Sequence, residues 1–242
     1  MASVFKALSA MLTYPTSELQ AATAEIGGTI AACPAIPGRL RAQLQNLLNE
    51  LATGDLYDLQ ERYVLLFDRT RSLSLHLFEH VHGESRDRGQ AMIDLKNLYE
   101  KHGLAVSAGE LPDFVPLFLE FLSTRPMAES CELLGQPAHI LAALAERLRK
   151  RSSTYEAVFR ALVALASAKP KDEQVTSLLQ EPDVDATDLA ALDKAWEDEP
   201  VNFGPGAGDG CKDNLIARIR AGRRPAPGMA TTTVARPPIT RS

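Results

Sequence analysis

The sequence predicts an all-α fold, a single multi-helix bundle domain followed by a disordered C-terminal tail. The 242 residues include 34 Leu and 34 Ala but only 11 Val and 8 Ile. Leu and Ala lose little rotamer freedom in a helix, whereas β-branched residues suit a pleated sheet. Apolar residues also recur at helical spacing through the first 168 residues, in runs separated by short joints. No fixed-period repeat and no alternation of strands with helices appears in the sequence.

Caps and breakers place the predicted helices. Pro15 ends the first apolar run. Ser17 and Gln20 have the spacing of a capping box for the second helix, and Asp55 is expected to cap the fourth. The predicted helices cover about residues 4–12, 18–30, 40–51, 56–67, 72–82, 86–102, 112–122, 127–134, 138–151 and 155–168.

Three of these helices rest on more specific signals. Residues 72–82 alternate like a strand and also fit a helix, and we expect a helix because the neighbouring segments are helical and no partner strand is visible. Ser85 is expected to cap the following helix, which Gly103 ends. Pro112 is expected to begin the next one, with Asp113 in its first turn, where a carboxylate suits the helix dipole.

The C-terminal third differs in composition from the rest. Residues 172–199 carry ten acidic side chains and one lysine, and every second residue is Gly between 204 and 210. We therefore expect a helical domain over 1–170, an acidic and partly helical extension over 171–200, and a flexible tail over 201–242.

Composition also disfavours several protein classes. The net charge of −5 disfavours a nucleic-acid partner. No apolar run approaches the ~18 residues that cross a bilayer, so stable membrane insertion is not expected. Three widely spaced cysteines form neither a CxxC pair nor an even disulfide set. The chain is expected to be a reduced, cytoplasmic protein.

Reactive side chains are dense in one stretch, HLFEHVHGE, which runs from His76 to Glu84. On a helix, His76 and His80 would share a face and could both reach a metal ion. Glu79 and His82 match the Glu-x-x-His unit of di-iron bundles, but no second copy exists. We favour helix caps and ion pairs here and predict no catalytic residue, no metal and no cofactor. The alternative is a metal-binding protein or metal-dependent helical hydrolase built on this stretch.

Two runs carry a family resemblance. YVLLFDRTRSLSLHLFEHVHGESRDRGQAMIDL, residues 63–95, closely resembles the signature of the NarJ-type nitrate reductase assembly chaperones, also called the delta subunit. ELPDFVPLFLEFL, residues 110–122, resembles the second signature of that family. The similarity in organisation covers about residues 1–168 and is most specific over 63–122.

The second run also separates branches of the wider family, the chaperones for molybdoenzymes of the dimethyl sulfoxide reductase type. Those proteins have a Glu-x-Pro-Asp-His pattern, which Glu110, Pro112 and Asp113 match. Phe114 stands where the wider pattern has histidine. An aromatic residue there is typical of the nitrate reductase branch.

The resemblance implies a cytoplasmic, non-catalytic, all-helical chaperone. Such proteins bind the immature catalytic (alpha) subunit of the membrane-bound nitrate reductase and hold it competent for insertion of the molybdenum cofactor before it docks on its membrane partner. They also assist maturation of an iron–sulfur centre. Recognition would involve the N-terminal segment of the catalytic subunit, lying as a helix in an apolar groove with charges at its rim. Molybdenum cofactor biosynthesis proteins are further expected partners.

Partner-binding residues are therefore expected between 63 and 122. The candidates for the apolar walls are Phe67, Leu77, Phe78, Phe114, Leu117, Phe118 and Phe121. The candidates for an acidic rim around a basic peptide are Glu79, Glu84, Asp87, Glu110 and Glu120. Asp68, His80 and Asp113 complete the set. For the apolar residues the alternative is ordinary core packing, and for the acids it is solvation or an intramolecular pair.

Overall fold

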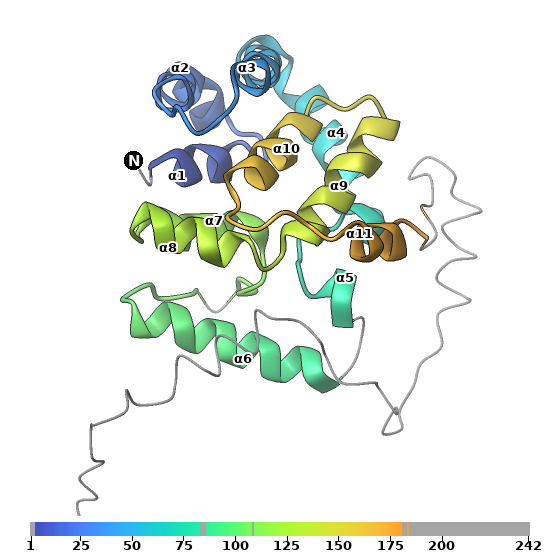
Figure 1. The fold of residues 1–242 in the computed structure, drawn as a ribbon. Helices are drawn as coiled ribbons and strands as arrows, with labels where there is room; N and C mark the ends of the chain where they lie inside the picture. The colour runs from blue at the N-terminus through green and yellow to red at the C-terminus, as the bar shows by residue number, and fades with distance from the viewer. Residues whose placement is uncertain (1–2, 83–85, 108, 181–182, 184–242) are drawn as a thin grey trace, which may run out of the picture.

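The computed structural model describes residues 3–82, 86–107, 109–180 and 183 (Figure 1). This part of the chain is all-α, as the composition predicts. Its helices are α1 (Ser3–Ala10), α2 (Ser17–Ala31), α3 (Gly38–Thr53), α4 (Leu56–Phe67), α5 (Glu79–His82), α6 (Arg86–Lys101), α7 (Val115–Ser123), α8 (Met127–Leu134), α9 (Ala138–Lys150), α10 (Glu156–Leu165) and α11 (Asp172–Leu179), with the 3-10 helix η1 (Arg71–Leu73). None of these helices has the length and apolar character that crossing a bilayer requires.

The helices pack in pairs that share a few central members. α1 lies against both α2 and α7, and α2 pairs with α3. α9 pairs with α10, which also contacts α3, and α11 lies beside α9 (Figure 1). The 3-10 helix η1 contacts α9 as well, so the first signature run meets the C-terminal half of the bundle.

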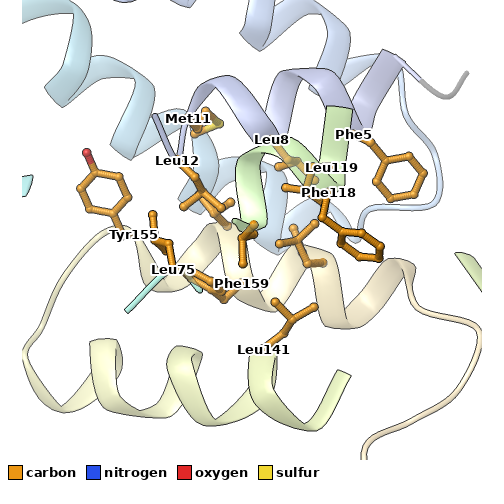
Figure 2. Packing of buried hydrophobic residues seen from close by; sticks show 14 of the residues in the cluster. Phe5, Leu8, Met11, Leu12, Leu75, Phe118, Leu119, Leu141, Tyr155 and Phe159 are labelled. Atoms are coloured by element: carbon orange, nitrogen blue, oxygen red, sulfur yellow. The ribbon is translucent and has the colours of Figure 1, made fainter. Parts of the chain in front are cut away.

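The core lies where α1 meets α7 and α10. Figure 2 shows Phe5 and Leu8 of α1 near Phe118 and Leu119 of α7, together with Phe159 of α10. All five side chains are buried. Truncating a buried phenylalanine costs about 3–5 kcal/mol, so this contact is a main source of stability for the fold.

Most of the predicted helices are confirmed, together with two of their signals. The Asp55 side chain accepts hydrogen bonds from the amides of Tyr57 and Asp58 (2.9 and 3.4 Å) at the start of α4. Gly103 follows α6 with φ +82°, a left-handed conformation that favours glycine. The Ser85 cap lies outside the described residues. The apolar stripe of α3 is buried along its length, at Leu40, Leu44, Leu47, Leu48 and Leu51.

The predicted cap of α2 is wrong. Thr16, not Ser17, is the N-cap: its backbone is extended, and its Oγ1 accepts a hydrogen bond from the Leu19 amide (3.2 Å). Ser17 is therefore already helical. Gln20 was expected to complete the capping box, but its side chain donates instead to the backbone oxygen of Leu51 (2.9 Å), which links α2 to α3.

Residues 72–82 do not form the single predicted helix. After η1 the chain is irregular over 74–78, with a single bridge residue at His76, and the next helix is α5. This irregular stretch pairs with the backbone just before α7, because the Val115 amide donates to the backbone oxygen of Leu75 (2.8 Å) and the Leu77 amide donates to that of Asp113 (3.1 Å). The same pairing keeps Pro112 and Asp113 outside α7, which begins at Val115 rather than at Pro112.

Candidate functional site

The two runs that carry the family resemblance meet in space. We call residues 74–78 and 113–115 the signature crossover, since one segment comes from each run. His76 and Phe114 form an isolated antiparallel bridge at its centre, and their ring centroids lie 5.4 Å apart. A short β-like pairing inside an all-α protein thus joins residues almost forty positions apart in the sequence.

Asp113 holds the crossover together through its side chain. The residue is 0% exposed. Its Oδ2 accepts a hydrogen bond from the Phe78 amide (3.0 Å), and its Oδ1 lies 3.2 Å from Nδ1 of His76. Next to it, the buried Tyr99 hydroxyl of α6 donates to the backbone oxygen of Pro112 (2.8 Å). Because a buried carboxylate needs hydrogen-bond partners, these contacts fix the geometry of the loop before α7.

The crossover favours the charged form of His76. Its hydrogen bond to Asp113 raises the pKa of His76 above the ordinary value of 6.5, although partial burial acts in the opposite direction. The negative charges of Asp113 and Glu79 also raise this pKa, and the nearby Arg88 lowers it. His76 and Asp113 therefore form an ion pair when the imidazole is protonated.

His80, in contrast to His76, favours its neutral form. It is buried, and its Nε2 donates a hydrogen bond to the backbone oxygen of Ser74 (2.8 Å), which can only accept. Burial lowers the pKa of His80 below its ordinary value, against the effect of that hydrogen bond. His80 is therefore neutral at neutral pH and carries its hydrogen on Nε2.

The two histidines do not form the shared helix face expected for a metal site. His76 lies in the irregular stretch before α5 and His80 in α5 itself; one ring nitrogen of His76 contacts Asp113, and one of His80 contacts Ser74. Among the described residues, no group of three His, Cys, Asp or Glu side chains is placed to hold a metal ion. Glu84 of the predicted cluster lies outside the described residues.

Glu79 links α5 to α6. Its Oε1 lies 3.1 Å from Nη2 of Arg88, and both side chains are half-buried. Burial alone would raise the pKa of the Glu79 carboxyl, but hydrogen bonds with Ser74 and Arg88 and the Arg88 charge lower it overall. Glu79, predicted as part of an acidic rim, is thus held in an intramolecular pair.

The predicted apolar walls lie mostly in the core. Phe67 contacts the rings of Tyr63 and Tyr155 (5.0 and 5.2 Å between centroids), and Phe121 contacts Tyr99 (4.8 Å). Leu77, Phe78, Leu117 and Phe118 are buried as well. Phe114 is half-buried, which leaves part of its ring at the surface beside the crossover.

The predicted acidic residues divide into two groups. Asp68, Glu110 and Glu120 are exposed. The Glu110 carboxylate accepts a hydrogen bond from the Ser107 hydroxyl (2.9 Å). Asp87 lies in the first turn of α6, and its side chain is not among those described. Among the predicted acids whose side chains are described, Asp68, Glu110 and Glu120 lie at the surface.

Arg147 of α9 is a buried charged residue that was not among the residues predicted from the sequence. It is 1% exposed, and it donates to the backbone oxygens of Ser72 in η1 (2.7 Å) and Leu178 in α11 (2.6 Å). The helical period could have found it, since Arg147 falls three residues after Leu144 on the buried face of α9. An arginine on an apolar face needs a buried partner, and two backbone carbonyls supply it.

Comparison with known proteins shows which family the sequence belongs to. The family model described as nitrate reductase delta subunit matches residues 33–161, more than half of the sequence. The chain belongs to this family. It is 44% identical over 209 residues to the nitrate reductase molybdenum cofactor assembly chaperone NarJ of Escherichia coli (strain K12), covering 86% of this chain and 87% of that protein.

Two further relatives are similar over the shared region. The probable nitrate reductase molybdenum cofactor assembly chaperone NarW of Escherichia coli (strain K12) is 45% identical over 160 residues, 66% of this chain and 69% of its own. The probable chaperone NarJ of Bacillus subtilis (strain 168) is 32% identical over 161 residues, 66% of this chain and 86% of its own. Both signature runs and Arg147 lie inside the part that the family model matches, and α11 follows that part but lies within the longer similarity to NarJ of Escherichia coli, which covers 86% of this chain.

Proposed function

We propose that this delta subunit family protein is an assembly chaperone. It binds the immature catalytic (alpha) subunit of the membrane-bound respiratory nitrate reductase and keeps it competent for molybdenum cofactor insertion before membrane docking. The observation that carries the proposal is the 44% identity, over most of both chains, to a protein named for this role. The resemblance of residues 63–95 and 110–122 to the family signatures supports it independently.

The crossover supports a binding protein rather than an enzyme. The charged and polar groups in and beside the crossover form hydrogen bonds with each other or with the backbone. Asp113 accepts from the Phe78 amide, His80 contacts the Ser74 backbone oxygen, and Glu79 pairs with Arg88. These contacts position segments of the chain. We therefore assign the chain no catalytic residue and no chemistry of its own.

The contact surface for the client includes the start of α7 and its acidic surroundings. Glu110 precedes this helix, Phe114 is its N-cap, and Glu120 is exposed on it. Asp68 at the end of α4 is exposed, and we propose that Glu84 and Asp87, which lie two residues before and one residue after Arg86 in the sequence, add to the acidic character. A basic amphipathic helix matches such a surface, because its apolar side meets Phe114 while the acids attract its charges. The N-terminal segment of the catalytic subunit is the proposed occupant.

The remaining parts of the account follow from this role. Maturation of the catalytic subunit precedes membrane docking, so the chaperone acts in the cytoplasm. Molybdenum cofactor biosynthesis proteins are proposed as transient partners at the same stage. We propose residues 1–170 as the chaperone domain; the acidic extension expected at 171–200 is described only for residues 171–180 and 183, and the tail expected at 201–242 lies outside the described residues.

Co-purification tests the proposal. The tagged chain is expressed with the catalytic subunit, either complete or without its N-terminal segment, in cells that lack other delta subunit proteins. We expect the complete catalytic subunit to co-purify and the shortened one to be lost or strongly depleted. Equal recovery of both forms would contradict binding through the N-terminal segment, and recovery of neither would contradict the chaperone role.

A further inference from the structure

α11 is an amphipathic helix docked on α9. Its Val175, Leu178 and Leu179 are half-buried at spacing i, i+3, i+4, whereas its other residues are exposed and none is fully buried. An isolated helix of eight residues is far shorter than the roughly 12–15 that persist in water. α11 is therefore helical because it is docked, and the small area that it buries makes the docking weak.

Polar contacts define where this helix ends. Arg147 donates to the backbone oxygen of Leu178 in the last turn of α11 (2.6 Å), so a cation lies at the negative end of the helix dipole. Just beyond the helix, Oδ1 of Asp183 accepts from the Ser72 hydroxyl (2.7 Å) and from Arg151 (2.8 Å). We call α11 with Asp183 the strap, and Ser72, Arg147 and Arg151 the strap face.

The strap face is continuous with the first signature run. Ser72 belongs to η1, just before the first segment of the crossover, and its backbone oxygen accepts from Arg147 (2.7 Å). Ser72, Arg147 and Arg151 all lie within the part of the chain that the delta subunit family model matches, and the strap follows that part in the sequence. The strap thus covers a surface of the region that the family model matches.

We propose that the strap face is a helix-docking site which the strap occupies in the client-free protein, in competition with the N-terminal helix of the client. The inference rests on the proposed function and adds a second contact region and its regulation. The docked helix shows what this face accepts: apolar side chains in the places of Val175, Leu178 and Leu179, and terminal carbonyls at Arg147. An amphipathic client helix offers both.

Mass action sets how much the docked strap weakens binding of the client helix. A client that binds only the open form has an apparent Kd equal to its intrinsic Kd divided by the open fraction. A strap that is docked in nine molecules of ten therefore weakens binding about tenfold. Loss of a single contact that holds the strap raises the open fraction, and the apparent affinity rises with it toward that limit.

Peptide titration on the full chain tests the competition. The probe is a synthetic peptide of the N-terminal segment of the nitrate reductase catalytic subunit. Asp183→Ala removes the carboxylate between Ser72 and Arg151, and Leu178→Ala removes a half-buried side chain but keeps the carbonyl at Arg147. We expect each variant to bind the peptide about three- to tenfold more tightly than the wild type.

Matched controls separate strap release from general effects. Glu61→Ala removes an exposed carboxylate on α4, and Thr176→Ala changes an exposed residue of α11. Both are expected to leave the affinity unchanged. If Asp183→Ala and Leu178→Ala bind the peptide no more tightly than the wild type does, the strap does not compete with the client helix.

Hydrogen exchange on the wild-type chain gives a second readout that needs no variant. At saturating peptide, the amides of α11 are expected to exchange faster than in the free protein, while those of α9 stay protected. If the peptide binds while α11 stays protected, the proposed competition is wrong and the proposed function is unaffected. A peptide that binds neither the wild type nor any variant would contradict the proposed function itself, and the strap with it.

Discussion

Oδ1 of the buried Asp113 carboxylate lies 3.2 Å from Nδ1 of His76, so the second signature run holds the first in place. The other carboxylate oxygen accepts the Phe78 amide, so one side chain fixes both a ring and a backbone group. The aspartate of the family pattern is therefore a structural residue in this protein. Its conformational role also explains why the loop before α7 is not helical.

Asp113→Ala is expected to lower the free energy of unfolding by about 1–3 kcal/mol, because the Phe78 amide loses its buried acceptor. Asp113→Asn keeps a carbonyl oxygen in that place and should cost less. Urea denaturation followed by circular dichroism measures both. Glu110→Ala, an exposed acid of the same loop, is the control and should stay within about 0.5 kcal/mol of the wild type. A cost for Asp113→Ala no larger than this control would contradict the assignment.

The His76–Asp113 pair makes part of the stability depend on pH. Because the pKa of His76 is raised by its hydrogen bond to Asp113, the pair contributes fully below the unfolded pKa of about 6.5. This contribution is lost as pH rises through the folded pKa. The difference in unfolding free energy between the wild type and His76→Asn should therefore shrink between pH 6 and pH 8.5. A difference that stays constant or grows would show that the pair does not stabilise the fold.

His80 titrates with the opposite sign, so the pH profile of the wild type alone does not isolate His76. Burial lowers the pKa of His80, and its contribution is present above the unfolded pKa of about 6.5 and lost as pH falls toward the folded pKa. The difference between the wild type and His80→Asn should accordingly grow between pH 5 and pH 7. The same denaturation series measures it, and a difference that falls over this range would contradict a buried neutral imidazole.

The helical spacing of apolar residues predicted the helices that bury one face and expose the other. The leucine stripe of α3 from Leu40 to Leu51 has a single interpretation, and the structure confirms it. Residues 72–82 fit a strand through Leu73, Leu75 and Leu77 and fit a helix equally well through Leu73, Leu77, Phe78 and Val81. The structure is decided by a backbone partner at 113–115 that no local pattern indicates. The metal-site alternative depended on a helix at 72–82, so it loses its geometry with that helix. Arg147 shows the reverse case, since its position on the apolar face of α9 could have been used.

The acidic residues around α7 and α6 are expected to attract the client. Reversing the charges of Glu84, Asp87 and Glu120 together should weaken binding of the N-terminal peptide and make it less sensitive to salt, with helicity unchanged. Calorimetric titration at low and moderate salt measures both effects. Glu61→Lys, at an exposed position on α4, should leave binding unchanged. An unaltered affinity in the folded triple variant would place the acidic contact elsewhere.

Residues beyond 200 are expected to be dispensable. After Gly222 the sequence has only Met229, Val234 and Ile239 as sizeable apolar residues, too few to offset the entropy of ordering. A chain truncated after residue 200 keeps α11 and Asp183, should melt like the full chain, and should support assembly of active nitrate reductase. Loss of enzyme maturation in a truncated chain that still folds would show that the tail makes a functional contact.

If this chain prepares the catalytic subunit for its cofactor, the molybdenum content of that subunit depends on the chain. This content is measured in catalytic subunit purified from cells that lack this chain and other delta subunit proteins, and from the same cells supplied with it. We expect low molybdenum per subunit without the chain and a content restored toward one cofactor equivalent with it. Equal molybdenum content in the two preparations would contradict this role.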